Sequence, residues 1–492
     1  MSGRSGSHLG VAALVVYWLV QAATLGISDD EAYYWVLSRS PALGYTYHPP
    51  MVAWLIRASD FLFGWLPLPR ELIVRLPGVA LSAAALLLAL KWLREVTGRR
   101  EIPASVTACV AVPGLAALSW MMVPDHSLIF GWMLCFVASW RIIARDKPRR
   151  RDLLMLGAGA AIGMLSKFSA ILFCLSAAAA LLLMTRRSRA RAMVALAIGA
   201  AVAAIPILVW NSKNHWAALV YQLGSRHAGG GWDLRRYGTF WVTQLLLAGS
   251  VGIAGAALLA RRWRNGRRLE PAEKFLALWA APAGVFLVQP AYSPFKPHWA
   301  LVFWLPVALA CALEQLRSGA WTLPARVHAA FLVLLLALGF GATQWPLTSL
   351  ASRWWNGATP NPLWDVSNDL SGWSELCELL GRAGVPADAP IVGSRYQTAA
   401  QAAFAAWPGR VATLSPASEV EKKEWPALED WIREEGPGRW PRLLRPVVYV
   451  SDDRYGEPPR FPNASCVPAG TIDSPRFGVA RKGIHALFCS PR

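Results

Sequence analysis

Long apolar stretches recur through the first 346 residues of this 492-residue chain, and they constrain its fold more than any other feature. A membrane helix needs about 20 predominantly apolar residues to cross roughly 30 Å of hydrocarbon. Stretches that reach or approach this length lie at residues 9–27, 73–93, 102–120, 127–144, 153–185, 193–210, 238–260, 275–291, 298–316 and 327–346. Hydrophobic residues make up 55% of the chain and charged residues 16%, which is typical of a polytopic membrane protein and excludes a disordered chain or a coiled coil.

The stretch 153–185 is too long for one simple span, and Ser166-Lys167 interrupts it. Lys and Arg gather in cytoplasmic loops, and both flanks of this stretch are basic. The stretch must therefore go out and return, as two short helices with Lys167 near the outer turn. One long tilted helix is the alternative and would invert every later segment. The charge distribution favours the two short helices, and the alternation then closes with about eleven membrane segments.

The net charge of +19 lies wholly in the apolar part of the chain. Residues 1–346 carry 33 Lys and Arg against 14 Asp and Glu, whereas residues 347–492 carry 16 of each. Nucleic-acid binding needs a basic stripe on a soluble face, and the neutral tail has none, so this class of function is excluded. No small-residue cleavage site follows the first apolar stretch, which predicts an uncleaved first span.

The sequence divides into a membrane domain, residues 1–346, and a domain outside the cytoplasm, residues 347–492. In the second part the apolar runs 390–393 and 446–450 alternate with the helical stretches 373–383 and 397–406. This alternation predicts a small α/β domain, without the glycine fingerprint of dinucleotide binding. An oxidising compartment would permit a disulfide between Cys466 and Cys489, leaving Cys377 free.

The long first external loop, residues 28–72, begins with Ser28-Asp29-Asp30-Glu31. Residues 32–40 and 50–64 are predicted to form helices along the membrane surface. Ser28 and Glu31 have the spacing of a capping box, which is the structural alternative to a chemical role for the acids. Capping does not require three consecutive acids beside a bilayer, so we interpret Asp30 and Glu31 as candidates for acid/base chemistry.

Other polar residues lie on the same predicted outer face, and each also has a plain structural explanation as a turn residue, a helix cap or a side chain reaching the interface. They are His48, Asp125, His126, Lys167, Asn211, Lys296 and His298. Taken together, cations near the outer leaflet suit a phosphate group, which Lys binds as a point charge.

These motifs resemble those of glycosyltransferase family 39, the bacterial relatives of dolichyl-phosphate-mannose protein mannosyltransferases within the GT-C superfamily. Asp30-Glu31-Ala32-Tyr33-Tyr34-Trp35 followed by His48-Pro49-Pro50 is similar to the family's first-loop signature. Further matches follow in order at Pro124-Asp125, Leu165-Ser166-Lys167, Val209-Trp210-Asn211, His298-Trp299, Gly372-Trp373 and Arg395-Tyr396-Gln397. The resemblance covers nearly the whole chain.

The resemblance implies a GT-C fold, a sugar donor on a polyprenyl phosphate, and transfer with inversion on the outer face of the bacterial inner membrane. It makes Asp30 the general base that deprotonates the acceptor, and Glu31 a residue that orients the base or binds the sugar. Donor phosphate or substrate binding is then expected of His48, Asp125, His126, Lys167, Asn211, Lys296 and His298. Related aminoarabinose transferases carry Lys where this chain has His48, and this weaker, titratable cation argues against aminoarabinose as the sugar.

The expected function is an inverting glycosyltransferase of an envelope glycolipid such as lipid A or lipopolysaccharide core, embedded among membrane lipids. Protein O-mannosylation is an alternative within the same class. A flippase or transporter of a lipid-linked substrate and a scaffold protein are alternatives of other classes. No obligatory cofactor and no nucleotide-sugar site are expected, and a divalent metal stays open because no motif indicates its ligands.

Overall fold

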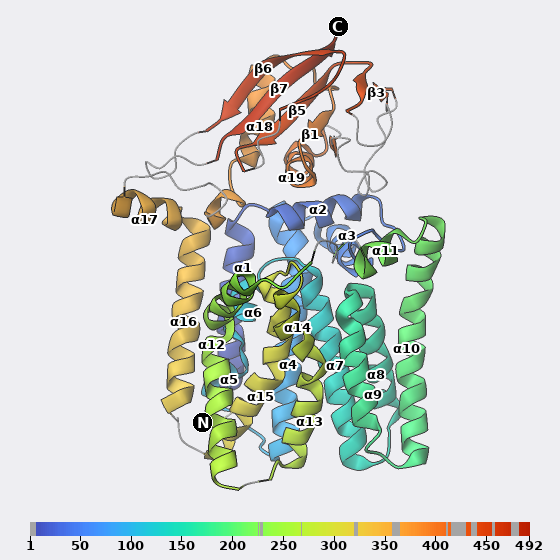
Figure 1. Cartoon of the computed structure of the whole chain (residues 1–492), viewed down its shortest axis with the longest axis vertical. Coiled ribbons are helices and arrows are strands. Elements are labelled where there is room, and N and C mark those ends of the chain that lie inside the picture. The colour runs from blue at the N-terminus through green and yellow to red at the C-terminus, as the bar shows by residue number, and fades with distance from the viewer. Residues whose placement is uncertain are drawn as a thin grey trace. The chain divides into compact units, whose positions relative to one another are not determined.

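The computed structural model describes residues 6–224, 226, 230–266, 268–318, 323–356, 365–409, 412–414, 430–433, 440–454, 458–473 and 482–492. These residues form two compact units (Figure 1). Unit 1 comprises Met1–Ala22, Leu43–Val52 and Arg75–Ala337, and unit 2 comprises Ala23–Ala42, Ala53–Val74 and Leu338–Arg492. The helices α1, α3, α4 and α16 each run from one set of residues into the other.

Unit 1 is built of apolar helices. Its long helices are α1 (Gly6–Thr24), α4 (Arg70–Thr97), α7 (Pro124–Arg145), α10 (Arg186–Lys213), α12 (Leu234–Arg264), α15 (Leu301–Ser318) and α16 (Leu323–Gln344). The shorter elements α13 (Pro271–Ala280), η3 (Pro282–Gly284), α14 (Val285–Val288) and η4 (Gln289–Ala291) follow one another. Within the described residues, eight segments are long and apolar enough to cross a membrane. The predicted polytopic α-helical fold is therefore confirmed.

The predicted single span at 102–120 is wrong. Two short helices stand there instead, α5 (Ala104–Val110) and α6 (Pro113–Leu118). Helix α5 ends at Val110, and α6 starts at Pro113, whose fixed φ and missing N–H suit the first position of a helix. Hydropathy alone could not reveal this break because the residues on both sides are equally apolar.

The predicted interruption of the stretch 153–185 is confirmed. Helix α8 (Arg150–Ser166) ends just before Lys167, whose extended backbone (φ −156°, ψ 139°) precedes η1 (Phe168–Ala170) and α9 (Ile171–Leu181). Asp146 precedes α8 and Thr185 follows α9. The backbone N–H and the hydroxyl of Thr185 donate to the Asp146 carboxylate at 3.3 and 3.2 Å. Because the flanks touch, the chain goes along the bundle and returns, with Lys167 at the reversal.

Helix α8 packs closely between α7 and α10, and glycines permit the approach (Figure 1). A Cβ on Gly159 would lie 2.8 Å from the backbone nitrogen of Cys135 on α7. A Cβ on Gly199 of α10 would lie 2.1 Å from the carbonyl oxygen of Gly157. Small residues at such contacts let membrane helices pack by close van der Waals contact. Helix α8, which leads to the reversal at Lys167, is thus held in place by close packing against α7 and α10.

Unit 2 contains a five-stranded mixed sheet in the order β2-β1-β5-β7-β6. The parallel part is β2 (Ala412–Leu414), β1 (Ile391–Gly393) and β5 (Val447–Asp452), and β7 (Ile484–Pro491) runs antiparallel to β5 and to β6 (Ala464–Ile472). A separate two-stranded sheet consists of β3 (Ile432–Arg433) and β4 (Arg442–Leu443). The helices are η7 (Val366–Asn368), η8 (Trp373–Glu375), α17 (Leu347–Asn356), α18 (Leu376–Arg382) and α19 (Tyr396–Ala406). The predicted C-terminal α/β fold is confirmed.

The sheet has an apolar core on each face. Val448 and Val450 of β5 pack with Leu376 and Leu380 of α18, whereas Tyr449 between them packs in a second cluster on the opposite face. This division follows from the alternation of side chains along a strand. Cys466 and Cys489 are directly opposite each other on β6 and β7, and a disulfide joins them.

Most of the first loop packs in unit 2 with the C-terminal part of the chain. The two helices expected in this loop are α2 (Asp29–Arg39) and α3 (Met51–Phe63). The ring of Trp35 on α2 contacts Phe404 and Trp407 edge-on, with ring centroids 5.1 and 5.6 Å apart. The Arg70 guanidinium donates to the carbonyl oxygen of Phe404 at 2.6 Å. The C-terminal domain and residues 28–42 and 53–72 of the first loop therefore belong to one folded unit.

Candidate functional site

Unit 1 contains a cavity of about 160 Å³ with charged residues in its lining, which we call the cation pocket. Its charged residues come from separate elements: Asp125 from the start of α7, Lys167 from the reversal between α8 and α9, and Arg226 from the segment after α11 (Ala217–Leu223). Its other polar and aromatic lining residues include Tyr47, His48, Gln222, Gln289 and Trp299. The pocket thus joins three of the residues that the sequence proposes, His48, Asp125 and Lys167.

Lys167 is held at the pocket by an ion pair. Its Nζ donates to Oδ1 and Oδ2 of Asp125 at 2.8 and 2.9 Å, and both side chains are largely buried, with 12% and 13% of their surfaces exposed. The same Nζ lies 5.7 Å from the centre of the Trp299 ring. The carboxylate offsets the cost of burying the ammonium group and fixes its position.

Arg226 was not proposed from the sequence, although Asn211, which precedes it along the chain, was. Its guanidinium carbon lies 4.1 Å from the centre of the Trp299 ring. Its Nη1 donates to Oε1 of Gln222 at 2.7 Å, and Nε2 of Gln222 donates to the carbonyl oxygen of Tyr47 at 2.9 Å. Arg226 is thus tied to the residue next to His48. No local motif distinguishes this Arg from others, so only the fold could find it.

His48 differs from its expected role as a titratable cation. Burial, followed by the positive charges of Lys167 and Arg226, lowers the pKa of His48 to about 3, against the smaller opposing effect of Asp125. The ring is therefore neutral at pH 7, and Lys167 and Arg226 carry the pocket's positive charge. A neutral imidazole still has one N–H donor and one acceptor for a ligand.

Lys296 and His298 lie around the same charges. Lys296 precedes η5 (Pro297–Ala300), and its charge contributes to lowering the pKa of His48. His298 interacts electrostatically with Asp125. The backbone N–H of Trp299 donates to the carbonyl oxygen of Lys296 at 3.1 Å. Neither Lys296 nor His298 is among the residues that line the cavity, so both act on it at longer range.

Two other proposed residues have structural contacts outside the pocket. The ring Nδ1 of His126 is 3.0 Å from the hydroxyl of Ser82 on α4. The buried Asn211 amide donates to the carbonyl oxygen of Ile207 at 2.9 Å and accepts from the N–H of Leu219 at 3.3 Å. The second of these bonds connects α10 to α11, so Asn211 organises the turn that leads to Arg226.

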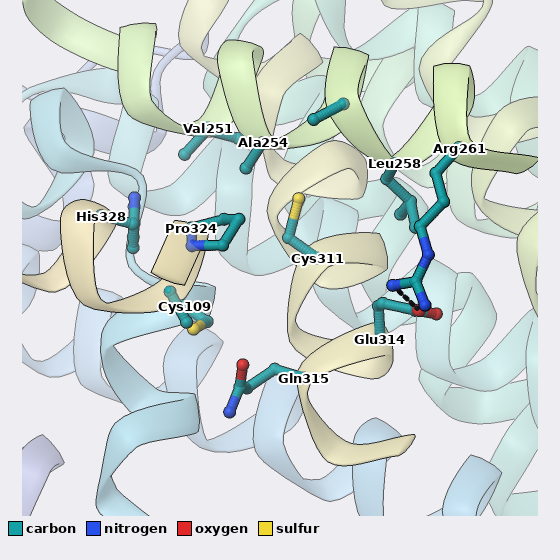
Figure 2. Close-up of a pocket in the computed structure, with 12 residues that line it drawn as sticks. Cys109, Val251, Ala254, Leu258, Arg261, Cys311, Glu314, Gln315, Pro324 and His328 are labelled. Atoms are coloured by element: carbon teal, nitrogen blue, oxygen red, sulfur yellow. Dashed lines mark ion pairs between the residues drawn. The ribbon is translucent and has the colours of Figure 1, made fainter. Parts of the chain in front are cut away.

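A second cavity of about 160 Å³ in unit 1 has different chemistry (Figure 2). His328 uses both ring nitrogens there, at 2.9 Å from the Ser250 hydroxyl and 2.7 Å from the carbonyl oxygen of Ala108. Arg261 is paired with Glu314 at 3.6 Å. With these groups engaged, the cavity offers mainly apolar surface, and the cation pocket is the better candidate for an anionic ligand.

In unit 2 the three acids at the start of α2 have three different environments. Glu31 is fully buried and closes a capping box, in which its Oε2 accepts from the Ser28 N–H at 3.1 Å and from the Ser28 hydroxyl at 3.0 Å. Asp29 is buried and pairs with Arg454 at 3.0 Å. Asp30 is partly exposed, and Oδ1 accepts from the Tyr396 hydroxyl at 3.5 Å. Of the three carboxylates, that of Asp30 is the most accessible to a substrate.

Glu31 therefore has the capping role that was the structural alternative, and its contacts explain its burial without a ligand. Among the residues that the structure describes, no group of three or more His, Cys, Asp and Glu side chains could hold a metal ion.

Comparisons with known proteins agree with this architecture. Residues 47–210 match the family model of dolichyl-phosphate-mannose-protein mannosyltransferases. Over 324 residues the chain is 28% identical to lipid A galacturonosyltransferase RgtD of Rhizobium johnstonii, a match that covers 61% of this chain and 63% of that protein. The chain thus spans somewhat less than two thirds of the length of this curated relative.

The fold is similar to that of ArnT from Cupriavidus metallidurans, solved in complex with undecaprenyl phosphate and in the apo state. The TM-scores are 0.60 and 0.59 at 14% sequence identity, and 97% of each chain is covered in both comparisons. A shared fold over this length includes both the helical part and the C-terminal sheet. The fold that the resemblance implies is therefore confirmed, and the match of residues 47–210 to the mannosyltransferase family model agrees with the resemblance.

Proposed function

We propose that this protein is an inverting glycosyltransferase that moves a sugar from a polyprenyl phosphate to a lipid A-type glycolipid of the bacterial envelope. The observation that carries the proposal is the cation pocket, in which Lys167 and Arg226 flank the Trp299 ring. Two cations beside one acid give the pocket a net positive charge, which suits a phosphate that gains negative charge as it leaves. The lipid A substrate of the named relative supports the choice of acceptor.

In this proposal Asp30 is the general base. Its carboxylate takes the proton from an acceptor hydroxyl, and the hydroxyl oxygen attacks the anomeric carbon of the sugar. The bond from that carbon to the phosphate oxygen breaks, and polyprenyl phosphate leaves with the electron pair. Lys167 and Arg226 stabilise the developing negative charge, and Asp125 positions Lys167 through their ion pair.

We place the chain in the inner membrane, with residues 347–492 on the periplasmic side, because the basic loops predict this orientation. Cys377 is exposed and free, so it offers a direct test of sidedness. A thiol reagent that cannot cross membranes should label Cys377 in spheroplasts. Labelling only after the membrane has been opened would reverse the orientation.

The function is tested by comparing the masses of envelope lipids from a null strain complemented with wild type, Asp30→Asn or Lys167→Met. We expect one sugar mass to disappear in the null strain and to return only with wild type. The name of the Rhizobium johnstonii relative makes galacturonic acid the first sugar to test. Full restoration by Asp30→Asn would contradict a base-dependent transferase and favour a flippase. Loss of sugar from the protein fraction alone would favour protein O-mannosylation.

A further inference from the structure

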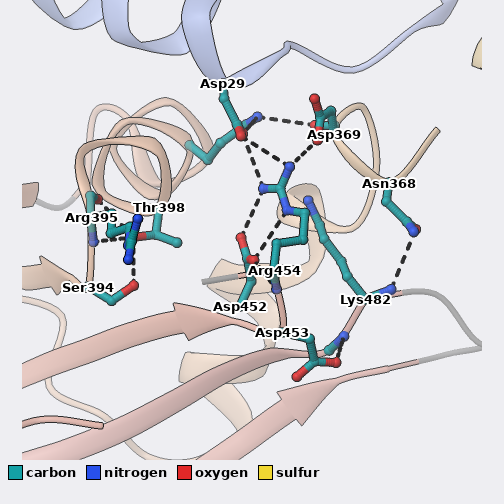
Figure 3. A network of polar contacts seen from close by, with 12 residues as sticks. Asp29, Asn368, Asp369, Ser394, Arg395, Thr398, Asp452, Asp453, Arg454 and Lys482 are labelled. Carbon is teal, nitrogen blue, oxygen red and sulfur yellow. Dashed lines mark hydrogen bonds and ion pairs between the residues drawn. The ribbon is translucent and has the colours of Figure 1, made fainter. Parts of the chain in front are cut away.

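The helix that carries Asp30 begins inside a buried polar network of unit 2 (Figure 3). The centre of the network is Arg454, which follows β5 and whose side chain is fully buried. Its guanidinium pairs with Asp29 at 3.0 Å, with Asp452 at 2.9 Å, and with Asp369. One cation from the C-terminal sheet thus holds the residue immediately before Asp30.

Gln401 on α19 provides a second anchor at the same point. Its Nε2 donates to the carbonyl oxygen of Ile27 at 2.9 Å, to Oδ1 of Asp29 at 3.0 Å and to the carbonyl oxygen of Asp369 at 3.2 Å. Only 1% of the Gln401 side chain and backbone surface is exposed. Arg454 and Gln401 therefore fix both the backbone and the side chain that lead into α2.

Helix α19 also contacts α2 beyond these anchors. The Tyr396 ring meets Tyr33 edge-on with centroids 5.3 Å apart, and its hydroxyl lies 3.5 Å from Oδ1 of Asp30. The Trp35 ring, two residues further along α2, packs against Phe404 of α19. The C-terminal domain thus reaches Asp30 itself through Tyr396, and the turn before it through Gln401 and Arg454.

Packing of α19 against α2 does not by itself require the ionic and amide contacts at the start of α2. Apolar packing of similar volume usually stabilises a buried contact as well as an ionic network does, because removing charges from water is costly. Here the ionic and amide contacts are concentrated at residues 27–29, while the aromatic contacts lie along the rest of α2. The directional contacts are therefore placed where they determine how the first turn of the helix, and with it Asp30, is oriented.

We propose that Arg454 and Gln401 are positioning residues, through which the C-terminal domain holds Asp30 in the orientation needed to deprotonate the acceptor. This inference rests on the proposed function, in which Asp30 is the base. It gives the C-terminal domain a part in the transfer step. It also predicts that loss of either anchor lowers turnover without lowering affinity for the lipid phosphate.

The test measures sugar transfer and binding of undecaprenyl phosphate by the full-length protein in Arg454→Met, Arg454→Lys and Gln401→Met. Arg445→Met is the matched control, because Arg445 is an exposed Arg of the same domain that lies over the Trp431 ring. We expect Arg454→Met to lower turnover at least about a hundredfold and Gln401→Met about tenfold, with binding within about twofold of wild type. Arg454→Lys should recover part of the turnover, and Arg445→Met should resemble wild type.

Thiol labelling of Cys466 and Cys489 after brief exposure to reductant reports whether the domain is folded in each variant. Wild-type turnover in folded Arg454→Met or folded Gln401→Met would overturn the inference. If both variants expose the thiols at once, the two residues act on folding alone, and the inference is likewise overturned. If Asp30→Asn keeps full turnover, the proposed function itself fails. If Asp30→Asn loses turnover but Arg454→Met and Gln401→Met do not, only the inference about positioning is refuted.

A double-mutant cycle with Asp29→Asn tests whether Arg454 acts through Asp29. If it does, Asp29→Asn combined with Arg454→Met should lower turnover no more than the stronger single change, because both remove the same link. Fully additive losses would contradict positioning through Asp29.

Discussion

Replacing Lys167 by Met should weaken the binding of undecaprenyl phosphate in a way that a second substitution can partly reverse. Two unit charges 4 Å apart attract by about 4 kcal/mol at an effective dielectric constant of about 20. Removing Lys167 loses this attraction, while the repulsion between Asp125 and the phosphate, roughly 3 kcal/mol at about 6 Å, is present in both proteins and is no longer outweighed. Arg226 and solvent offset part of the change, so we expect a net loss of about 3 kcal/mol, or roughly a hundredfold in affinity.

Adding Asp125→Asn to Lys167→Met removes the repulsion and keeps the shape of the side chain. Because solvent and Arg226 offset about half of that repulsion, the double variant should bind undecaprenyl phosphate about tenfold more tightly than Lys167→Met alone. Tryptophan fluorescence of the detergent-solubilised protein measures the binding, and Lys147→Met is the control because Lys147 is an exposed Lys outside the pocket. Unchanged affinity in Lys167→Met, or a double variant that binds no better than the single one, would refute the electrostatic reasoning.

Three further changes test other parts of the account. Because the pKa of His48 is lowered to about 3 from 6.5, the folded state loses stability as the pH falls from 6.5 toward 3. His48→Gln should therefore show a smaller decrease in Tm over this range than the wild type. An equal decrease in the two proteins would contradict a neutral His48 ring. Cys489→Ser removes a disulfide whose two cysteines are 23 residues apart, and it should destabilise the C-terminal domain by roughly 3 kcal/mol in denaturant titrations. Thiol labelling of Cys489 in non-reduced, denatured wild type would show that no disulfide exists. Gly163→Val should lower Tm strongly, because a Cβ at this position would lie 2.1 Å from the Phe173 ring. Gly249→Ala should be tolerated, because its Cβ would have no contact closer than 3.6 Å. Equal Tm values for the two variants would contradict the packing.

The helical part of the fold could be predicted because crossing a membrane requires long apolar segments, and these stand out locally in a sequence. The reversal at Lys167 could also be predicted, since its two flanks are basic and a charge pattern reports which segments share a side. The break before Pro113 was missed because the hydropathy profile continues smoothly through it. Pro113 gave no clear signal either, because Pro77, Pro206 and Pro306 lie inside the continuous helices α4, α10 and α15.

The candidate site could be predicted only in part. The sequence proposes Lys167 and Asp125 correctly as members of one charged group, but their ion pair joins residues 42 positions apart. Arg454 is 425 residues from Asp29, so no local pattern could connect the two. The neutral state of His48 depends on burial and on cations from other elements, which only the folded chain brings together.

The role of the three acids shows the same limit. The spacing of Ser28 and Glu31 predicts a capping box, and the structure has one, yet the spacing cannot tell which neighbouring acid stays accessible. That depends on Arg454 and Gln401, which cover Asp29 and leave Asp30 partly exposed.

The most direct measurement incubates purified full-length protein with an undecaprenyl-phosphate-linked sugar and lipid A, and follows the product by mass and by the configuration of its anomeric carbon. The account predicts a single added sugar with inverted configuration for wild type. It predicts loss of this product, with donor binding retained, for Asp30→Asn. Transfer at the wild-type rate by Asp30→Asn, or a product with retained configuration, would contradict a single displacement with Asp30 as the base.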